Sequence, residues 1–150
     1  MALTEIERAI QDFESGTGQE VFKRANAAPE GIQAIADALK LEFPPQFREF
    51  YETYDYFSYG PEETLSPDEI VATYHHIAKR SKSKDHRYLP FMPDGAGGYY
   101  VIVCRRVGGK EDSEFGCVMF LPFGRLHDME LESSDFVRFL VSRMASRKEL

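Results

Sequence analysis

The 150-residue chain contains no tryptophan, only two cysteines and only four histidines. No run of residues approaches the roughly 18 consecutive apolar positions that a membrane span requires. The first residues carry neither the basic start nor the apolar core of a secretory signal, so we expect a cytoplasmic protein. Both cysteines, Cys104 and Cys117, lie among apolar residues. Two such thiols fit a reducing compartment, and we expect both to stay reduced.

The patterns of common catalytic and cofactor-binding sites are also missing. No serine lies in a G-x-S-x-G turn, and no two histidines have the i, i+4 spacing of a helical zinc site. His75 and His76 are neighbours, so on a helix they would face different directions. Neither cysteine has the cationic setting that favours a thiolate. The sequence predicts no catalytic residue, no metal and no cofactor. An enzyme whose pocket residues are scattered along the chain stays open as the alternative.

The net charge of -7 and the pI of about 5.1 make the chain acidic. Such a chain repels nucleic acid and anionic lipid, so we expect it to bind neither nucleic acid nor membrane. It would attract a basic partner. The segment from Lys79 to Arg87 is rich in lysine and arginine, so its local charge is positive. We expect a solvated connector there, and contact with nucleic acid or an acidic partner is the alternative.

A chain of this length suits one domain, which we expect to span residues 1–150. Apolar residues at helical spacing predict five helices. Ser66, Pro67 and Glu69 form the start signal of the fourth helix, with a capping box. The segment from Gln19 to Ala28 is compatible with a short helical turn. The five apolar stripes are Leu3, Ile6, Ile10 and Phe13; Ile32, Ile35, Ala36 and Leu39; Phe47, Phe50, Tyr51 and Tyr54; Ile70, Tyr74 and Ile77; and Phe136, Val137, Phe139, Leu140 and Met144.

The stretch from Leu89 to Val103 reads as a strand, a glycine-rich turn and a second strand. A strand follows the glycines where a phosphate-binding loop would have a helix, so the turn is expected to be structural. Residues 99–104 are apolar on both faces, which predicts a central strand covered on both sides. Further strands are expected over 115–121 and 128–131. The turn residues are Asp94, Gly95, Gly97 and Gly98.

The order of helices, strands and a closing helix predicts an α+β fold. We expect a twisted, antiparallel-rich sheet with the N-terminal helices and the C-terminal helix packed on it.

Two segments are candidates for a partner-binding surface. Residues 54–63 mix aromatic and acidic side chains outside the helical stripe, and tyrosines beside carboxylates are typical of sites that bind basic proteins. The alternative is that Tyr56 and Phe57 cover the edge of the sheet. The loop before residue 115 offers a second group of acids. The candidate residues are Asp55, Tyr56, Tyr59, Glu62 and Glu63, and in the second segment Glu111, Asp112 and Glu114.

Three blocks together resemble the SUKH superfamily, which contains the Smi–Knr cell-wall regulators and bacterial toxin-immunity proteins. Residues 32–51 resemble its amphipathic helix, proline break and aromatic helix. Residues 89–101 resemble its strand, D-G-x-G turn and strand. Residues 134–140 are similar to its closing S-F-x-x-F-L helix, and the resemblance covers about 29–144. Ala36 stands where a glutamate is usual, and Gly98 replaces the aspartate that often ends the turn.

The resemblance implies a non-enzymatic protein-binding module. In bacteria such domains commonly act as immunity proteins that hold a toxin inactive, whereas in fungi the resemblance points to a regulatory scaffold. Because complementary charge speeds encounter, the acidic chain would suit a basic toxin domain.

Overall fold

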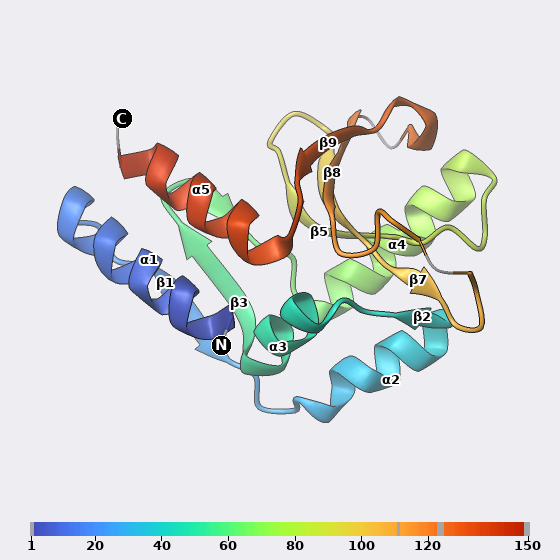
Figure 1. Ribbon diagram of the computed structural model, residues 1–150, viewed down its shortest axis with the longest axis horizontal. Coiled ribbons are helices and arrows are strands. Elements are labelled where there is room, and N and C mark those ends of the chain that lie inside the picture. Colours follow the sequence, from blue (N-terminus) through green and yellow to red (C-terminus); the bar gives the residue numbers. More distant parts are fainter. Residues whose placement is uncertain (1, 111, 123–124, 149–150) are drawn as a thin grey trace.

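The computed structural model describes residues 2–110, 112–122 and 125–148 (Figure 1). Within these residues no helix is both long and apolar enough to cross a membrane. The helices are α1 (Ala2–Thr17), α2 (Glu30–Leu39), α3 (Pro45–Thr53), α4 (Pro67–Ser81), the short 3-10 helix η2 (Leu126–Asp128) and α5 (Phe136–Lys148). The strands are β1 (Phe22–Ala25), β2 (Leu41–Glu42), β3 (Tyr54–Tyr59), β4 (Glu62–Glu63), β5 (Tyr88–Pro93), β6 (Tyr99–Val103), β7 (Arg105–Arg106), β8 (Val118–Leu121) and β9 (Glu130–Ser133).

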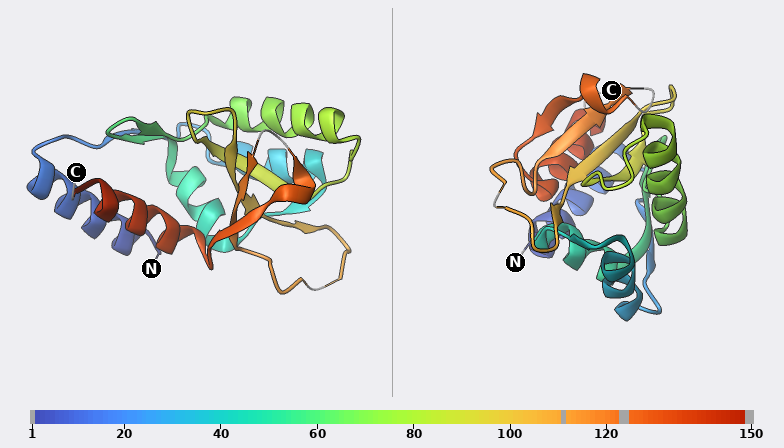
Figure 2. Two further views of the ribbon diagram at one scale, coloured as in Figure 1. Left: turned by 90° about the horizontal axis from the view of Figure 1, so that it is seen from above. Right: turned by 90° about the vertical axis from the view of Figure 1, so that its right-hand side faces the viewer.

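The strands form three antiparallel sheets. Their orders are β5-β6-β8-β9, β1-β3-β4 and β2-β7. Helices α1 and α5 lie side by side at one end of the molecule, while α4 runs along the four-stranded sheet beside β5 (Figure 2). The predicted α+β class, with an antiparallel-rich sheet and a closing helix, is confirmed.

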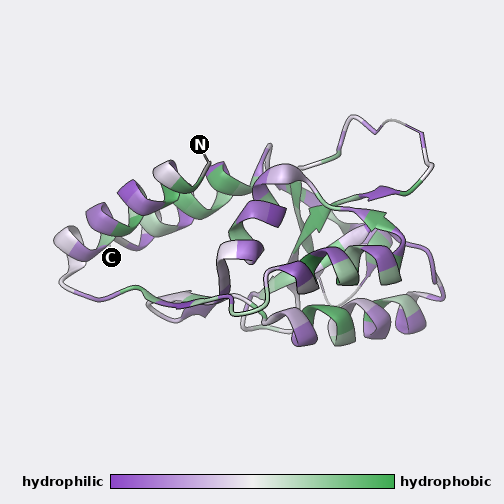
Figure 3. Cartoon of the chain, turned by 90° about the horizontal axis from the view of Figure 1, so that it is seen from below, coloured by the Kyte–Doolittle hydropathy of each residue, from purple (hydrophilic) through white to green (hydrophobic). Residues whose placement is uncertain are grey.

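Strand β6 lies between β5 and β8 and is covered on both faces, as its sequence predicts. Val101 and Val103 pack with Ile77 of α4 on one face. Tyr100 and Ile102 belong to the larger core on the other face, which α3 and α5 cover. Figure 3 shows the matching pattern, with largely hydrophobic strands between helices that alternate hydrophobic and hydrophilic turns.

The aromatic stripe of the third predicted helix lies in the hydrophobic core, as the helical spacing of its residues predicts. Phe47, Phe50 and Tyr51 of α3 are almost fully buried. The Phe47 ring contacts Phe91 of β5 and Phe136 of α5 at centroid distances of 6.0 and 5.3 Å, and the Phe50 ring contacts Phe136 at 5.1 Å. The Tyr51 hydroxyl donates to the Leu65 carbonyl at 2.8 Å, so its polar end is satisfied inside the core. This stripe therefore joins the helices to the large sheet.

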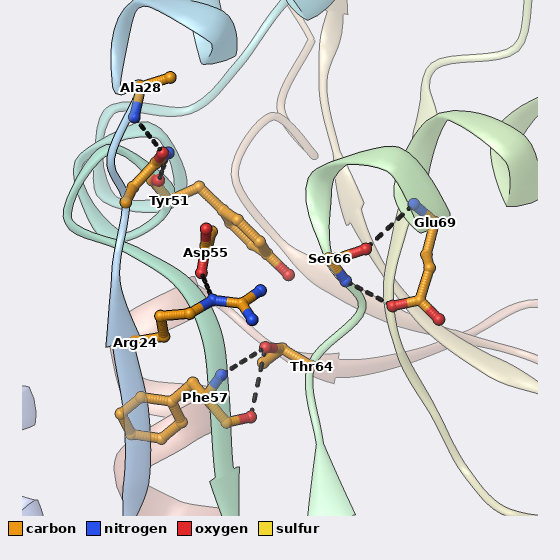
Figure 4. Close-up of polar contacts among 9 residues, drawn as sticks. Arg24, Ala28, Tyr51, Asp55, Phe57, Thr64, Ser66 and Glu69 are labelled. Atoms are coloured by element: carbon orange, nitrogen blue, oxygen red, sulfur yellow. Dashed lines mark hydrogen bonds and ion pairs between the residues drawn. The ribbon is translucent and has the colours of Figure 1, made fainter.

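The start of α4 has the capping box that its sequence predicts. The Glu69 backbone N–H donates to the Ser66 hydroxyl at 3.3 Å, and the Ser66 N–H donates to the Glu69 carboxylate at 2.9 Å (Figure 4). Pro67 occupies the first turn, where its missing N–H costs no helical hydrogen bond.

Several local predictions differ from the structure. Residues 19–28, which were compatible with a short helical turn, contain β1 instead, because this exposed strand is held by pairing with β3 rather than by an apolar pattern of its own. The strand expected over 115–121 begins only at Val118, because residues 113–116 form a turn. Tyr54 begins β3 and does not continue α3. The last strand begins at Glu130, two residues later than expected, because η2 takes up residues 126–128.

The glycine turn between β5 and β6 is held by Asp94. Its Oδ1 accepts hydrogen bonds from the N–H groups of Ala96 at 2.8 Å and Gly98 at 2.9 Å. Gly95 and Gly97 have φ angles of 84° and 93°, a region that other residues adopt at a cost. A Cβ atom on Gly98 would lie 2.9 Å from the Leu121 carbonyl oxygen. The prediction that this turn contains positive φ angles is confirmed.

Replacing Gly97 with valine should destabilise the protein, since its positive φ would cost a β-branched residue roughly 1–3 kcal/mol. We expect a lower melting temperature for Gly97→Val in thermal unfolding. Ala96→Val is the matched control, because Ala96 is an exposed neighbour without a positive φ. Equal melting temperatures for the two variants would show that the turn is not constrained in this way.

The two cysteines are unpaired but lie in different surroundings. Cys104 is fully buried and Cys117 is partly exposed. Burial raises the pKa of both thiols above the usual range. The Cys117 carbonyl accepts from the Val103 N–H at 2.9 Å, so the two cysteines lie on adjacent segments of the sheet.

Both thiols should react when the protein is denatured without reductant, and fewer than two free thiols would contradict the expected reduced state. In the folded protein, a thiol-specific dye should label Cys117 first because it is the more accessible. The Cys117→Ser variant should lose this fast phase and keep the slow one.

Candidate partner-binding site

The hairpin of β3 and β4 carries five of the predicted partner-binding residues. Ser58 pairs with Glu63 and Tyr59 with Glu62, and the turn passes through Gly60, whose φ is 57°. At the base of the hairpin, the Phe57 N–H donates to the Thr64 hydroxyl at 3.1 Å (Figure 4). Because side chains alternate along a strand, the hairpin divides the predicted residues between an outer and a buried side.

The outer face of the β1-β3-β4 sheet, which we define by Phe22, Arg24, Tyr56 and Glu63, is open to solvent. Directly opposed residues of an antiparallel pair share a face, and Arg24 opposes Tyr56 in the register. The Tyr56 hydroxyl donates to the Glu63 carboxylate at 2.7 Å. Phe22 is 62% exposed. This face combines two aromatic rings with one acid and one base.

Asp55 lies beside this outer face and is paired within the chain. Its Oδ1 accepts from the Arg24 Nε at 2.5 Å, as Figure 4 shows. Arg24 also lies over the Tyr56 ring, 6.0 Å from its centroid. The charge of Asp55 is therefore compensated, whereas no ion pair to Glu63 is present in the described part of the chain.

Tyr59 and Glu62, which were also expected to contact a partner, lie on the buried side and are not part of the outer face. Tyr59 has no exposed surface, and Glu62 is 8% exposed. The Tyr59 ring packs edge-on against Phe13 of α1 at 6.0 Å. Burial raises the pKa of Tyr59. The composition of this segment is that of a surface, and the alternation of side chains along β3 and β4 places these two residues inside.

Glu62 is instead held by two arginines of α5. Arg143 donates to Oε2 from Nη2 at 2.9 Å, and Arg147 donates to Oε1 from Nε at 2.9 Å. Burial alone would lower the pKa of Arg143, but the hydrogen bond and charge of Glu62 raise it overall. Sequence reasoning missed these arginines, because an i, i+4 pair on a closing helix is an ordinary surface pattern.

Breaking this cluster should destabilise the fold. Glu62→Ala would leave two arginines facing a buried site, and the expected loss is about 3 kcal/mol, the lower end for a broken buried pair, because both arginines reach solvent. Glu63→Ala is the matched control and should change the unfolding free energy little, since Glu63 is exposed. Chemical denaturation of both variants measures the difference, and equal midpoints would contradict a stabilising role for Glu62.

In the second candidate segment, the acidic side chains of Asp112 and Glu114 form ion pairs within the chain. Arg87 pairs with Asp112 and, at 2.9 Å, with Glu114. Arg87 is the last residue of the basic segment from Lys79 to Arg87. One positive charge of that segment therefore holds this loop in place. Glu111 lies outside the described residues.

A cleft brings the hairpin together with the glycine turn. It has a volume of about 300 Å³ and lies between the hairpin, β5 and the C-terminal half of α5. Its lining includes Glu62, Glu63, Asp94, Gly95 and Arg147. Gly97 and Gly98 complete the turn without lining the cleft. Two candidate groups that lie more than thirty residues apart in sequence thus share one hollow.

The buried histidine lies away from this cleft. His86 is 5% exposed, with Nε2 3.2 Å from the Tyr74 carbonyl oxygen and Nδ1 accepting from the Tyr88 N–H at 3.2 Å. Burial lowers the pKa of His86, and these contacts fit a neutral ring. Across the described ranges, no group of three or more His, Cys, Asp or Glu side chains is placed to hold a metal ion.

Comparison with known proteins places the fold in a family. No curated protein matches the chain. The sequence pattern of the SMI1 / KNR4 family (SUKH-1) matches residues 26–142, which run from the end of β1 into α5 and include the hairpin, the glycine turn and the aromatic helix. Since this match covers well over half of the chain, and since the antiparallel α+β fold agrees with it, the protein belongs to the SMI1 / KNR4 (SUKH-1) family.

Proposed function

We propose that this protein is an immunity protein, a non-enzymatic module that binds a basic toxin domain and holds it inactive, and that residues 1–150 act as one domain in doing so. Membership of the SMI1 / KNR4 (SUKH-1) family supports a Smi–Knr-type or toxin-immunity role in general. The observation that carries the finer proposal is the outer face of the β1-β3-β4 sheet.

The outer face has the residue types of a protein-binding surface. Tyrosine brings a large contact area and a polar end at low entropic cost, and it is enriched among residues that dominate binding energy. Tyr56 is held in place by its hydrogen bond to Glu63. Phe22 adds an exposed ring on the neighbouring strand. A partner that covers both rings would remove apolar surface from water.

The charges favour a basic partner. The whole chain has a net charge of -7. On the outer face Arg24 is neutralised by Asp55, which leaves the carboxylate of Glu63 without a cation among the described residues. Complementary charge of this kind raises association rates and disfavours acidic partners.

A regulatory scaffold of the Smi–Knr type is the second candidate function, because the same family match supports it. A scaffold and an immunity protein would both bind a protein, but only the immunity protein would suppress the toxicity of its partner. The enzyme alternative is less well supported, since the buried groups His86 and Cys104 are enclosed in the core and do not line the cleft described above.

The outer face should determine affinity for the partner. We expect Tyr56→Ala and Glu63→Lys each to weaken binding by more than about 1 kcal/mol while leaving the melting temperature unchanged. The partner is first recovered from native cells with the tagged full chain, and its affinity for each purified variant is then measured by calorimetry. Co-expression of chain and partner tests whether the toxicity of the partner is suppressed.

Glu130→Lys is the control, because it makes the same charge reversal on an exposed residue of β9. It should bind like the unaltered chain. Unchanged affinity in both outer-face variants would move the site away from this face. A recovered partner without toxicity would favour the scaffold over the immunity protein.

A further inference from the structure

We propose that the groove around the β3–β4 turn binds an extended, basic segment of the protein partner, and that the residues before the family match help to select that segment. This inference rests on the proposed function in one respect, that the partner is a protein. It adds a contact region that adjoins the outer face, shares Phe22 and Glu63 with it, and extends beyond it around the turn.

Three hollows meet at the turn and form what we call the hairpin groove. The first is the cleft of about 300 Å³ beside Asp94, the second has about 350 Å³ and the third about 580 Å³. Pro61 lines all three, Arg147 lines the first and second, and Gln19 lines the second and third. Shared lining residues show that the hollows follow one another around the turn. An elongated occupant fits such a path better than a compact ligand.

Part of the groove is lined by residues that precede the family match. The second hollow is lined by Phe13 and Thr17 of α1, and the third by Glu20 and Phe22. The match begins only at residue 26. In Figure 1 the C-terminal ends of α1 and α5 and the end of β3 lie at the same end of the molecule. A segment bound along the groove would therefore touch both the family domain and the addition to it.

The charges of the groove favour a basic occupant. Glu20 and Glu63 are exposed, and Asp94 lies at the far end of the first hollow. Arg143 and Arg147 also face the first hollow, and the carboxylate of Glu62 neutralises one of their two charges. With Glu63 and Asp94, the lining of this hollow has three acids against two bases, so its net charge is -1. A lysine or arginine side chain is therefore favoured there over a carboxylate or phosphate.

An apolar side chain of the occupant has a place at the other end of the groove. Phe22 is 62% exposed and Pro61 is exposed beside it in the third hollow. Exposed rings of this size next to a concave surface are typical of interaction sites. The expected segment therefore carries a basic residue toward Asp94 and Glu63 and an apolar residue toward Phe22.

Selection from a phage library of random 12-residue peptides tests this assignment with the full chain as bait. We expect enriched peptides that contain lysine or arginine together with an apolar residue. They should bind at least tenfold more weakly to Gln19→Trp, which fills the middle of the groove, to Phe22→Ser and to Glu63→Lys. All three changes are on exposed side chains, so melting temperatures should stay close to that of the unaltered chain.

Two matched controls lie on β9, at the edge of the four-stranded sheet. Leu131→Ser removes an apolar side chain that is 65% exposed, close to the exposure of Phe22, and Glu130→Lys repeats the charge reversal. Both should bind the peptides like the unaltered chain. The inference is overturned if no peptide is enriched, if the enriched peptides are acidic, or if they bind the groove variants and the unaltered chain equally.

Failure of this inference can be told apart from failure of the proposed function. If a toxic protein is recovered and neutralised, and if Gln19→Trp binds it with unchanged affinity, the groove assignment is wrong and the immunity function stands. If no protein partner is recovered but basic peptides bind the groove, the immunity proposal is wrong instead.

Discussion

The packing of the α3 aromatic rings is the interaction on which the rest of the structure depends. Phe47 contacts Phe91 of β5 and Phe136 of α5, and Phe50 contacts Phe57 of β3 and Phe136 again. One short helix thus joins the four-stranded sheet, the hairpin sheet and the closing helix. Edge-to-face contacts of this kind contribute about 0.5–1.5 kcal/mol each beyond the area that they bury.

This packing also fixes which side of the hairpin is available to a partner. Because Phe57 is turned toward Phe50, its neighbour Tyr56 must face the opposite side of the strand. The pair formed by Glu62 and the α5 arginines then holds β4 against the closing helix. The exposed residues of the outer face are therefore positioned by a core that they do not themselves enter.

Much of the fold could be predicted from the sequence, because its signals are local and periodic. The aromatic stripe of α3, the capping box at Ser66 and the two-faced strand β6 each express one rule of side-chain spacing. Strand β1 could not be predicted, because its four residues are all exposed and show no apolar pattern. It is a strand because it pairs with β3.

The candidate site could be predicted only in part, for a related reason. Tyr59 and Glu62 have the composition of a binding surface, and only the register of the hairpin places them inside. The arginines that neutralise Glu62 lie about 80 residues away in sequence, beyond the reach of any local pattern. The glycine turn, by contrast, could be predicted because positive φ angles strongly favour glycine.

The contact between α1 and α5 makes the two ends of the chain depend on each other during synthesis. Ile6, Ile10 and Phe13 of α1 are buried in the finished protein, in the same core as Leu140 and Met144 of α5. A nascent chain emerges from its N-terminus, so the part of the α1 stripe that packs on α5 stays uncovered until α5 has been made. Closing so long a loop costs entropy before any contact repays it. The packing of α1 on α5 is therefore expected to be a late step of folding, after α1 has met α3 and β3.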